Sequence, residues 1–380
     1  MKRRIALLGC TGSIGVQALD VIARFPGKFK VEALVAFSSH EALFAQVRAF
    51  RPKFAGLVVK PMAIPEDLRF ARWVFGEDCA AQAARLPEVT DVLAAMVGIA
   101  GLSPVLEAIE AGKRILLANK EALVAGGELV MNRARQKGVS ILPIDSEHSA
   151  IHQCLNGARG NRPRRLILTA SGGALRDIAY DDLENAAPAD VLAHPTWRMG
   201  KKITVDCATM VNKGLEVIEA HHLFGMDPGA IDVVIHPQSF VHSMVEFNDG
   251  ALMAQLGAPD MRVPIAYALG WPRRLPLDDT ACDLFSLPPL TFAAPEARRY
   301  PCLALAYDAL RAGGSAPVAL NAANEAAVEG FLRGQIPFGG IARAIASVLE
   351  HTQQHSITCL DDILEADRKA REMARLFMGQ

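Results

Sequence analysis

The sequence has no long hydrophobic run. Its most apolar stretch, residues 92–102, is about eleven residues long, whereas a helix needs about 20 apolar residues to cross a bilayer. Near the N-terminus, a short apolar run ends at a glycine-rich turn, which predicts a strand and not a signal peptide. We therefore expect no membrane partner.

An excess of charge of one sign is also missing. The 40 Lys and Arg residues nearly balance the 41 Asp and Glu residues, which excludes the usual signature of nucleic-acid binding. Disulfide and structural zinc frameworks are excluded as well, because the cysteines are odd in number, scattered and without a CxxC pair. Reduced thiols of this kind are typical of a cytoplasmic protein. They are Cys10, Cys79, Cys154, Cys207, Cys282, Cys302 and Cys359.

The chain has 380 residues, of which 51% are hydrophobic. This length and composition are typical of a globular protein of two or three domains. Residues 1–145 alternate short apolar runs with amphipathic stretches, as in 17–25 and 42–50. Such alternation predicts a Rossmann-like α/β domain with a parallel, doubly wound sheet. The expected strands are 4–8, 31–37, 55–59, 92–95, 114–117 and 140–143.

The pattern changes at residue 146, where a second sheet and an α+β catalytic domain are expected up to residue 271. A hairpin is expected around Asp249-Gly250. Residues 272–301 are rich in proline and predict a linker, and residues 302–380 predict a C-terminal helical domain. The expected strands of the second sheet are 166–170, 203–206, 233–236, 244–248 and 251–255.

A glycine-rich turn follows the first expected strand. Gly9, Gly12 and Gly15 are spaced three apart before a helical pattern, which favours dinucleotide binding over a plain turn. The second strand ends at residues 37–40, FSSH, without the carboxylate that binds an NAD ribose. This favours NADP, although Glu41 follows directly.

Two carboxylates follow the last expected strand of the first sheet. Asp145 and Glu147 are two residues apart, so an extended segment would place both side chains on one side, suited to Mg²⁺ or Mn²⁺. A helix N-cap followed by a first-turn glutamate explains the segment equally well.

Residues 201–219 are unusually polar. Asn212 and Glu216 would share a helix face beside Lys213, which fits phosphate and metal held close together. A solvated helix start is the alternative. Ser171-Gly172-Gly173 forms either an anion-binding turn or an ordinary one.

Large apolar side chains lie in an expected loop at residues 194–200. Trp197 and Met199 suggest a lid over a site, and a loop packed on its own domain is the alternative. His236 and His242 are either functional groups or buried structural histidines.

Taken together, these segments resemble the 1-deoxy-D-xylulose 5-phosphate reductoisomerase family. The similar stretches run in family order across nearly the whole chain. They are GCTGSIG (9–15), AGKRILLANKEALV (111–124), LPIDSEHSAI (142–151), TASGGALR (169–176), HPTWRMGKKITVDCATMVNKGLE (194–216), HPQSFVHSM (236–244), QLGAPDMRVPIAYAL (255–269), LTFAAPEARRYPCLALA (290–306) and ALNAANEAAV (319–328).

The resemblance implies an enzyme of the non-mevalonate isoprenoid precursor pathway, usually a homodimer. It implies that 1-deoxy-D-xylulose 5-phosphate is rearranged while a divalent metal chelates the ketone and a neighbouring hydroxyl, and is then reduced by NADPH to 2-C-methyl-D-erythritol 4-phosphate. The metal expected is Mn²⁺, Mg²⁺ or Co²⁺, and a mobile loop is expected at about 191–201.

Carried over by position, the resemblance assigns roles to individual residues. The metal ligands are Asp145, Glu147 and Glu216. The catalytic residues are Lys120, Glu147, His194, Lys213 and His242. The substrate-binding residues are Ser146, Glu147, Ser171, His194, Trp197, Met199, Cys207, Asn212, Lys213 and Glu216. The cofactor-binding residues are Gly9, Cys10, Thr11, Gly12, Ser13, Ile14, Gly15, Phe37, Ser38, Ser39, Ala100, Asn119, Lys120, Glu121 and Gly200.

The chain departs from the family pattern at three places. Cys207 and Cys10 each stand where a serine is usual, and residues 37–40 lack the usual Asn and basic residue near the 2′-phosphate. Because a thiol is a weaker donor than a hydroxyl, Cys207 implies weaker phosphate binding or a compensating neighbour.

Two rival interpretations remain at this point. A different two-domain Rossmann oxidoreductase would need no metal, and an NADP-binding sensor would have lost a metal carboxylate. All three carboxylates are present.

Overall fold

The computed structural model describes residues 2–158, 160–197 and 199–379. The chain divides into two compact units, neither of which is continuous in sequence. Unit 1 comprises Met1–Ala122, Val130–Ser149 and Asp260–Asp278, and unit 2 comprises Leu123–Leu129, Ala150–Pro259 and Asp279–Gln380. The finer division into four segments stays a prediction.

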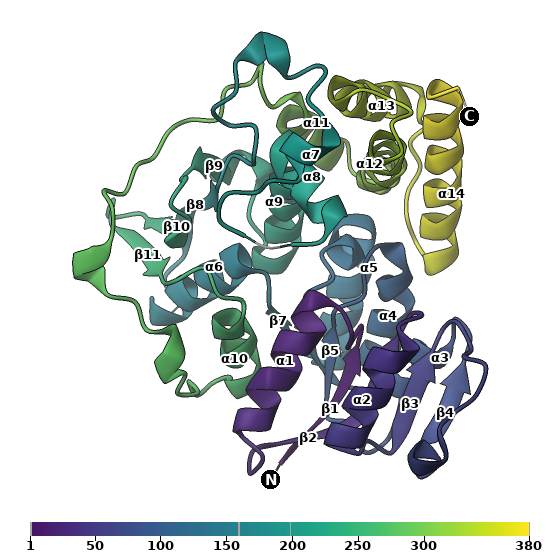
Figure 1. Cartoon of the computed structure of the whole chain (residues 1–380). Coiled ribbons are helices and arrows are strands. Elements are labelled where there is room, and N and C mark those ends of the chain that lie inside the picture. Colours follow the sequence, from purple (N-terminus) through teal and green to yellow (C-terminus); the bar gives the residue numbers. More distant parts are fainter. Residues whose placement is uncertain (1, 159, 198, 380) are drawn as a thin grey trace. The chain divides into compact units, whose positions relative to one another are not determined.

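Unit 1 is built on a parallel sheet with strand order β4-β3-β2-β1-β5-β6-β7 (Figure 1). The inner strands are buried nearly throughout, as expected when helices cover both faces of a parallel sheet. This confirms the Rossmann-like α/β prediction. The strands are β1 (Arg3–Leu8), β2 (Phe29–Ala36), β3 (Phe54–Leu57), β4 (Arg72–Phe75), β5 (Asp91–Ala94), β6 (Arg114–Leu117) and β7 (Ile141–Pro143).

One edge strand, β4, is absent from the sequence prediction. Its four residues are exposed or half-buried, so they carry no strong hydrophobic period. Trp73 nevertheless packs edge-on against Phe44 at 5.6 Å between ring centroids and stacks with Phe75 at 6.5 Å. Pairing with β3 and the packing of Trp73 against Phe44 of α2 (His40–Phe50) therefore hold this strand in the sheet.

The helices of unit 1 include one that returns from far along the chain. This helix, α10, packs against α1, and its residues Ile265 and Leu269 are fully buried in the core of unit 1. The helices are α1 (Ser13–Arg24), α2 (His40–Phe50), α3 (Cys79–Ala84), α4 (Leu102–Glu110) and α10 (Arg262–Gly270), with 3₁₀ turns η1 (Glu66–Leu68) and η2 (Ile99–Gly101). Helices α5 (Glu121–Lys137) and α6 (Ser146–Gly157) contribute residues to both units.

A buried carboxylate fixes the end of α10. Asp91 is 2% exposed and pairs with Arg114 and with Arg3. The same two guanidinium groups donate to the carbonyl oxygens of Leu269 and Trp271, which lie at the C-terminal end of α10. Cations are favourable at that end of a helix, so one ion-pair cluster joins β1, β5 and β6 to α10.

Unit 2 contains a mixed sheet with strand order β11-β10-β8-β9. Its strands are β8 (Pro163–Ala170), β9 (Ile231–Ile235), β10 (Val241–Phe247) and β11 (Leu252–Leu256). The predicted hairpin is confirmed, because β10 and β11 pair antiparallel around Gly250, whose φ is +82°. The Asp249 carboxylate accepts a hydrogen bond from the Ala251 amide at 3.0 Å within this turn.

The strand predicted at residues 203–206 is wrong, because these residues lie in helix α8 (Lys201–Thr209). The β-branched residues favour a strand locally, but a buried carboxylate decides otherwise. Asp206 is 1% exposed and pairs with Lys202 one turn earlier, at 2.9 Å. It also accepts a hydrogen bond from Asn324 at 2.9 Å. The contact with Lys202 requires the helical spacing, and the contact with Asn324 fixes the helix against α12 (Ala316–Leu332).

The remaining elements of unit 2 are mainly helical. They are α7 (Pro188–Val191), α9 (Val211–Phe224), α11 (Pro301–Ala312), α12 (Ala316–Leu332), α13 (Phe338–His351) and α14 (Leu360–Phe377), with 3₁₀ turns η3 (Tyr180–Asp182), η4 (Pro228–Ala230) and η6 (Leu284–Ser286); η5 (Asp278–Thr280) lies at the boundary. The predicted C-terminal helical segment is thus confirmed. No helix in the described ranges is long and apolar enough to cross a membrane.

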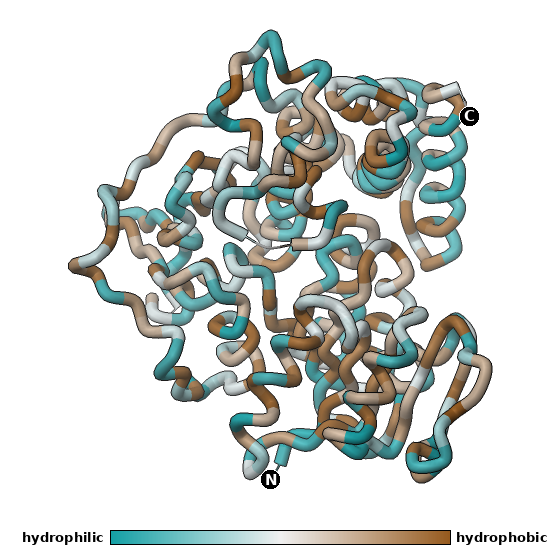
Figure 2. The backbone as a smooth tube through the Cα atoms, in the orientation of Figure 1, coloured by the Kyte–Doolittle hydropathy of each residue, from teal (hydrophilic) through white to brown (hydrophobic). Residues whose placement is uncertain are grey.

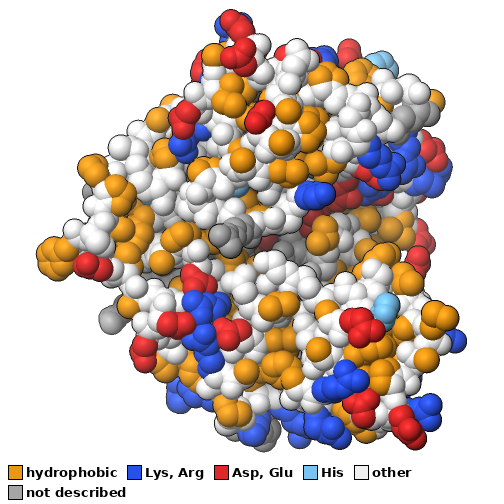
Figure 3. Space-filling model, in the orientation of Figure 1, with side chains coloured by type: hydrophobic (Ala, Val, Ile, Leu, Met, Phe, Trp, Pro, Cys, Tyr) orange, Lys and Arg blue, Asp and Glu red, His pale blue; other side chains and the backbone are white. Residues whose placement is uncertain are grey.

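Helix α12 forms the centre of this helical segment and is buried along almost its whole length. Helix α14 instead has one buried face, and Figure 2 shows it as largely hydrophilic. Figure 3 shows acidic and basic side chains gathered over it, in keeping with ion pairs such as Arg368 with Glu365 and Glu372.

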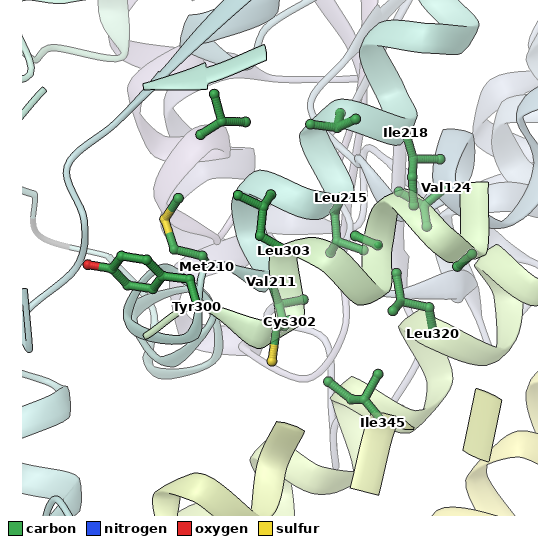
Figure 4. Packing of buried hydrophobic residues seen from close by; sticks show 14 of the residues in the cluster. Val124, Met210, Val211, Leu215, Ile218, Tyr300, Cys302, Leu303, Leu320 and Ile345 are labelled. Atoms are coloured by element: carbon green, nitrogen blue, oxygen red, sulfur yellow. The ribbon is translucent and has the colours of Figure 1, made fainter. Parts of the chain in front are cut away.

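The core of unit 2 brings α9 and α11 unusually close together. A Cβ atom added to Gly214 would lie 2.4 Å from the Cβ of Ala306, so only glycine fits at this contact. Figure 4 shows Val211 and Leu215 of α9 packed with Cys302 and Leu303 of α11. The backbone of α9 is thereby held against a rigid neighbour.

Candidate active site

The glycine-rich turn of unit 1 is shaped by close backbone contacts. Gly9 has φ +85°, and a Cβ there would lie 2.3 Å from the Ala95 carbonyl oxygen. A Cβ at Gly15 would lie 2.4 Å from the Gly9 carbonyl oxygen. The amides of Gly9 and Cys10 both donate to the Val35 carbonyl, at 2.8 and 3.0 Å. Two of the glycines are therefore required by the fold itself.

Gly12 is different, because no close contact within the described part of the chain requires a glycine there. It is exposed at the N-cap of α1, and an added Cβ would meet only the Gly9 carbonyl oxygen, at an ordinary 3.4 Å. The open space lies at a helix N-terminus, where a phosphate is bound well and where a side chain would stand in its way. The turn thus fits a dinucleotide pyrophosphate.

The other predicted cofactor residues of unit 1 divide into exposed and buried groups. Phe37 is 66% exposed at the end of β2, followed by exposed Ser38 and Ser39. The Cys10 side chain is buried in the core, and burial raises the pKa of its thiol far above the usual range. Cys10 therefore presents only its backbone to the turn. Among the others, Ser13 and Ala100 are exposed, Thr11 and Ile14 are half-buried, and Asn119 and Glu121 are buried.

Asn119, Lys120 and Glu121 join β6 to α5. The Asn119 amide donates to the Gly98 carbonyl at 3.0 Å and to the Glu121 carboxylate at 2.8 Å. Lys120 is 8% exposed, and its ammonium lies 2.9 Å from the Asp145 carboxylate. One predicted catalytic residue thus contacts one predicted metal ligand within unit 1.

The expectation of an extended segment at Asp145 and Glu147 is wrong. Helix α6 begins at Ser146, so Glu147 lies in its first turn and Asp145 immediately precedes it. The Ser146 hydroxyl donates to the Glu147 carboxylate. The carboxylates therefore sit at a helix N-terminus, where negative charge is stabilised.

In unit 2, α9 carries a buried polar cluster. Glu216 is 1% exposed, accepts a hydrogen bond from Asn212 at 2.6 Å and pairs with the Lys213 ammonium at 2.5 Å. The predicted shared helix face is confirmed, whereas the alternative of a solvated helix start is wrong because residues 211–220 are buried. A buried charge of this kind needs a partner, and the helix supplies it one turn away.

The turn after β8 brings Ser171 and His194 together. The Ser171 hydroxyl lies 2.9 Å from His194 Nε2, and the Gly173 amide donates to that hydroxyl at 3.2 Å. His194 Nδ1 accepts from the Thr196 and Trp197 amides, at 3.2 and 2.9 Å. Since Nδ1 accepts, the neutral ring carries its proton on Nε2 and donates to Ser171.

The rest of the predicted loop lies close to a second histidine. The Trp197 and His242 rings are 6.4 Å apart, and burial lowers the pKa of His242 from its usual value. Met199 is half-buried and Gly200 is the exposed N-cap of α8. Arg198, in the middle of this loop, lies outside the described residues.

His236 is a structural residue. Its Nδ1 contacts the Thr291 carbonyl at 2.9 Å, while Nε2 accepts from the Phe240 and Val241 amides at 3.2 and 3.1 Å. The ring also stacks on Phe292. Both nitrogens are thus used by the fold, which settles the two alternatives for this residue.

Arg176 was missed by the sequence analysis. Its guanidinium donates to the Ser171 carbonyl at 2.7 Å and lowers the pKa of His194, after burial as the larger cause. Its position in the stretch TASGGALR, three residues after the glycine pair, is the signal that could have found it. Cys207 lies in α8, whose backbone touches the same turn: a Cβ at Gly173 would lie 2.7 Å from the Cys207 carbonyl oxygen.

Comparison with known proteins decides the family. Three domain models of one family match in order: 1-deoxy-D-xylulose 5-phosphate reductoisomerase over residues 5–127, its C-terminal domain over 141–224, and the DXP reductoisomerase C-terminal domain over 256–373. The 1-deoxy-D-xylulose 5-phosphate reductoisomerase of Moorella thermoacetica is 51% identical over 98% of both chains. The chain belongs to this family.

Other reductoisomerases are also similar to this chain in sequence and structure. That of Aromatoleum aromaticum is 49% identical over 98% of this chain and 95% of its own. A solved DOX-P reductoisomerase in complex with NADPH, fosmidomycin and magnesium superposes with TM-score 0.92 at 40% identity, covering 99% of this chain and 98% of its own. The Zymomonas mobilis reductoisomerase in complex with NADPH gives TM-score 0.92 at 38% identity, covering 100% and 99%.

Family membership confirms the resemblance seen in the sequence and the expectation of an enzyme. It also removes the two rival interpretations, a metal-free dehydrogenase and a silent sensor. The roles of single residues are not settled by these similarities and remain predictions.

The geometry of His194 predicts how it titrates. Its folded pKa is lowered, first by burial and then by Arg176. Neutral His194 therefore stabilises the fold above the unfolded pKa of about 6.5, and this contribution is lost as the pH falls through the lower folded pKa. Below that value a proton on Nδ1 displaces the two loop amides.

We expect ¹⁵N NMR of the imidazole at pH 7.5 to show the Nε2-protonated tautomer and a midpoint below 6.5. Arg176→Gln should move the midpoint upward. A ring protonated on Nδ1 at pH 7.5 would contradict the assignment.

Proposed function

We propose that this chain converts 1-deoxy-D-xylulose 5-phosphate to 2-C-methyl-D-erythritol 4-phosphate with NADPH and one divalent metal ion, in the non-mevalonate isoprenoid precursor pathway. The observation that carries this proposal is family similarity over the whole chain, at 51% identity to one named reductoisomerase. The fold supplies a phosphate-accommodating turn in unit 1 and a buried lysine–glutamate pair in unit 2.

NADPH is proposed to bind on unit 1. The pyrophosphate would lie over the exposed Gly12 at the N-terminus of α1, because no side chain occupies that space. Ser38 and Ser39 are exposed at the end of β2 and would donate to the 2′-phosphate, with Phe37 beside the adenine. The other proposed cofactor residues are Gly9, Cys10, Thr11, Ser13, Ile14, Gly15, Ala100, Asn119, Lys120, Glu121 and Gly200.

The metal is proposed to bind Asp145, Glu147 and Glu216. All three are hard oxygen donors, as Mg²⁺ and Mn²⁺ prefer. A lysine ammonium neutralises one carboxylate in each unit, Lys120 at Asp145 and Lys213 at Glu216. When bound, the divalent ion stabilises negative charge that develops on the substrate oxygens. Magnesium is named in a solved relative, and manganese and cobalt are proposed alternatives.

The protein groups are proposed to bind and orient the sugar phosphate. Ser171 and Asn212 donate to the substrate, and the Lys213 ammonium supplies a positive charge beside it. His194 holds its proton on Nε2, aimed at the Ser171 hydroxyl. Trp197 and Met199 would exclude water from the reacting carbon atoms, with His242 packed behind Trp197. Ser146, Cys207 and Lys120 complete the proposed set.

One experiment tests both the proposed reaction and the proposed metal ligand Glu216. NADPH oxidation with 1-deoxy-D-xylulose 5-phosphate should require Mg²⁺ or Mn²⁺, and Glu216→Gln should lower kcat/KM at least about 100-fold, because it removes a charged ligand. Glu246→Gln is the control, since Glu246 lies on β10 and pairs with Arg165 of β8. Folded protein that binds NADPH but shows no turnover with any metal would overturn the proposed reaction.

Cys207 offers a gain-of-affinity test. A hydroxyl donates a stronger hydrogen bond than a thiol, so Cys207→Ser should lower KM for the sugar phosphate about fivefold. Cys154→Ser is the control, because Cys154 is buried in the core of unit 2. An unchanged or higher KM in the Cys207 variant would argue against a donor role at this position.

A homodimer is proposed to form through the edge of the unit 2 sheet. Strand β11 lies at this edge and exposes Leu252, Met253 and Leu256, and Figure 3 shows hydrophobic side chains on this side of the unit. An exposed apolar edge strand is covered well by a second copy of itself, in a two-fold arrangement.

Sedimentation equilibrium should therefore give a dimer for the wild type and a monomer for Leu252→Asp/Leu256→Asp. Leu364→Asp on α14, also an exposed leucine, should leave the dimer intact. A monomeric wild type, or a dimer in all three proteins, would refute this interface.

A cytoplasmic location is also proposed, because all the cysteines are free. Recovery of the chain only from an extracytoplasmic fraction would refute this location.

A further inference from the structure

The turn Ser171-Gly172-Gly173 cannot fix its own orientation. Both glycines have positive φ, +84° and +74°, and neither has a side chain that restricts rotation of the neighbouring peptide planes. An anion-binding turn nevertheless requires its amide groups to face the anion. Some other part of the protein has to select one orientation.

Side-chain donors from outside the turn hold its carbonyl groups. Arg176 donates to the Ser171 carbonyl at 2.7 Å, and the Tyr300 hydroxyl donates to the Gly172 carbonyl at 3.0 Å. Arg299 donates to the carbonyls of Leu175 and Ile178, at 3.1 and 2.8 Å. The backbone is thus anchored at two carbonyl groups within the turn and at two in the segment that follows it.

The bond from Tyr300 has a directional consequence. In a trans peptide the C=O and N–H groups point in opposite directions. Because the Gly172 carbonyl faces Tyr300, the Gly173 N–H of the same peptide faces the other way, where it donates to the Ser171 hydroxyl at 3.2 Å. Tyr300 therefore sets the side of the turn on which the donors lie.

Tyr300 is well placed to do this rigidly. It is 4% exposed and immediately precedes α11, which packs closely on α9 through Ala306 and Gly214. Figure 4 shows its ring beside Met210, at the start of α9. Burial raises the pKa of the phenol above its usual value, so the hydroxyl stays a donor.

We propose that Tyr300 is a positioning residue for phosphate binding, whose hydroxyl orients the Gly172–Gly173 peptide so that the turn presents its donors to the phosphate of the substrate. This inference rests on the proposed function, in which Ser171 contacts the sugar phosphate. Tyr300 would touch neither substrate nor metal. It links the turn to α11, the helix that also packs against α9.

Tyr300→Phe tests the proposal, because it keeps the buried ring and removes only the donor. We expect the dissociation constant for inorganic phosphate, measured by calorimetry, and KM for the sugar phosphate to rise about three- to tenfold. The dissociation constant for NADPH should be unchanged and kcat should change less than twofold.

Tyr307→Phe is a matched control. Tyr307 lies on α11, the helix that Tyr300 precedes, and its hydroxyl also donates to a backbone carbonyl, that of Ile231 at 2.7 Å, but not to the turn. Both variants should lose similar thermal stability, while only Tyr300→Phe weakens phosphate binding. Equal weakening in the two variants, or unchanged phosphate binding in Tyr300→Phe, would overturn the proposal.

The outcomes also separate this inference from the proposed reaction. A wild-type chain that neither binds phosphate nor turns over the sugar phosphate would remove both. A wild type that does both, beside a Tyr300→Phe variant with wild-type KM, would remove the positioning role alone.

Discussion

The buried carboxylate of Glu216 constrains much of unit 2. A negative charge that is 1% exposed is tolerated only where partners are held beside it, and here the partners are Lys213 and Asn212 on the same helix. This arrangement exists only at helical spacing, so it ties the polar chemistry to the integrity of α9. Gly214, between these residues, admits Ala306 and lets α11 close over the helix. The buried charge of Glu216 and the contact between Gly214 and Ala306 therefore both require the helical backbone of α9.

A common principle recurs in the two units. In each, a glycine of a candidate binding turn lies too close to neighbouring backbone for a side chain to fit: Gly9 against Ala95 in unit 1, and Gly173 against Ala208 in unit 2. Where a glycine is not required by packing, as at Gly12, open space remains for a ligand. Glycines such as Gly9 and Gly173 are thus needed for packing, whereas Gly12 leaves a surface that a ligand can approach.

The parts that were predictable from sequence are those set by local pattern. Strand–helix alternation gave the parallel sheet, Asp249-Gly250 gave the hairpin, and the spacing of Asn212 and Glu216 gave their shared face. The failures have non-local causes. Residues 203–206 have strand propensity but form a helix because Asp206 pairs with Lys202 and Asn324. Strand β4 depends on Trp73 packing against Phe44. Arg176 and Tyr300 lie in stretches that resemble the family, but no local pattern shows that each donates to a backbone carbonyl group.

The return of residues 260–278 to unit 1 bears on how the chain folds during synthesis. Arg3 and Arg114 are made early, yet the carbonyl groups of Leu269 and Trp271 that they bind appear only after all four strands of the unit 2 sheet have been translated. Helix α10 cannot pack against α1 until then. The N-terminal unit therefore cannot complete its core first, in contrast to the usual domain-by-domain order. The residues of α10 that complete the core of unit 1 are absent from the nascent chain for most of its synthesis.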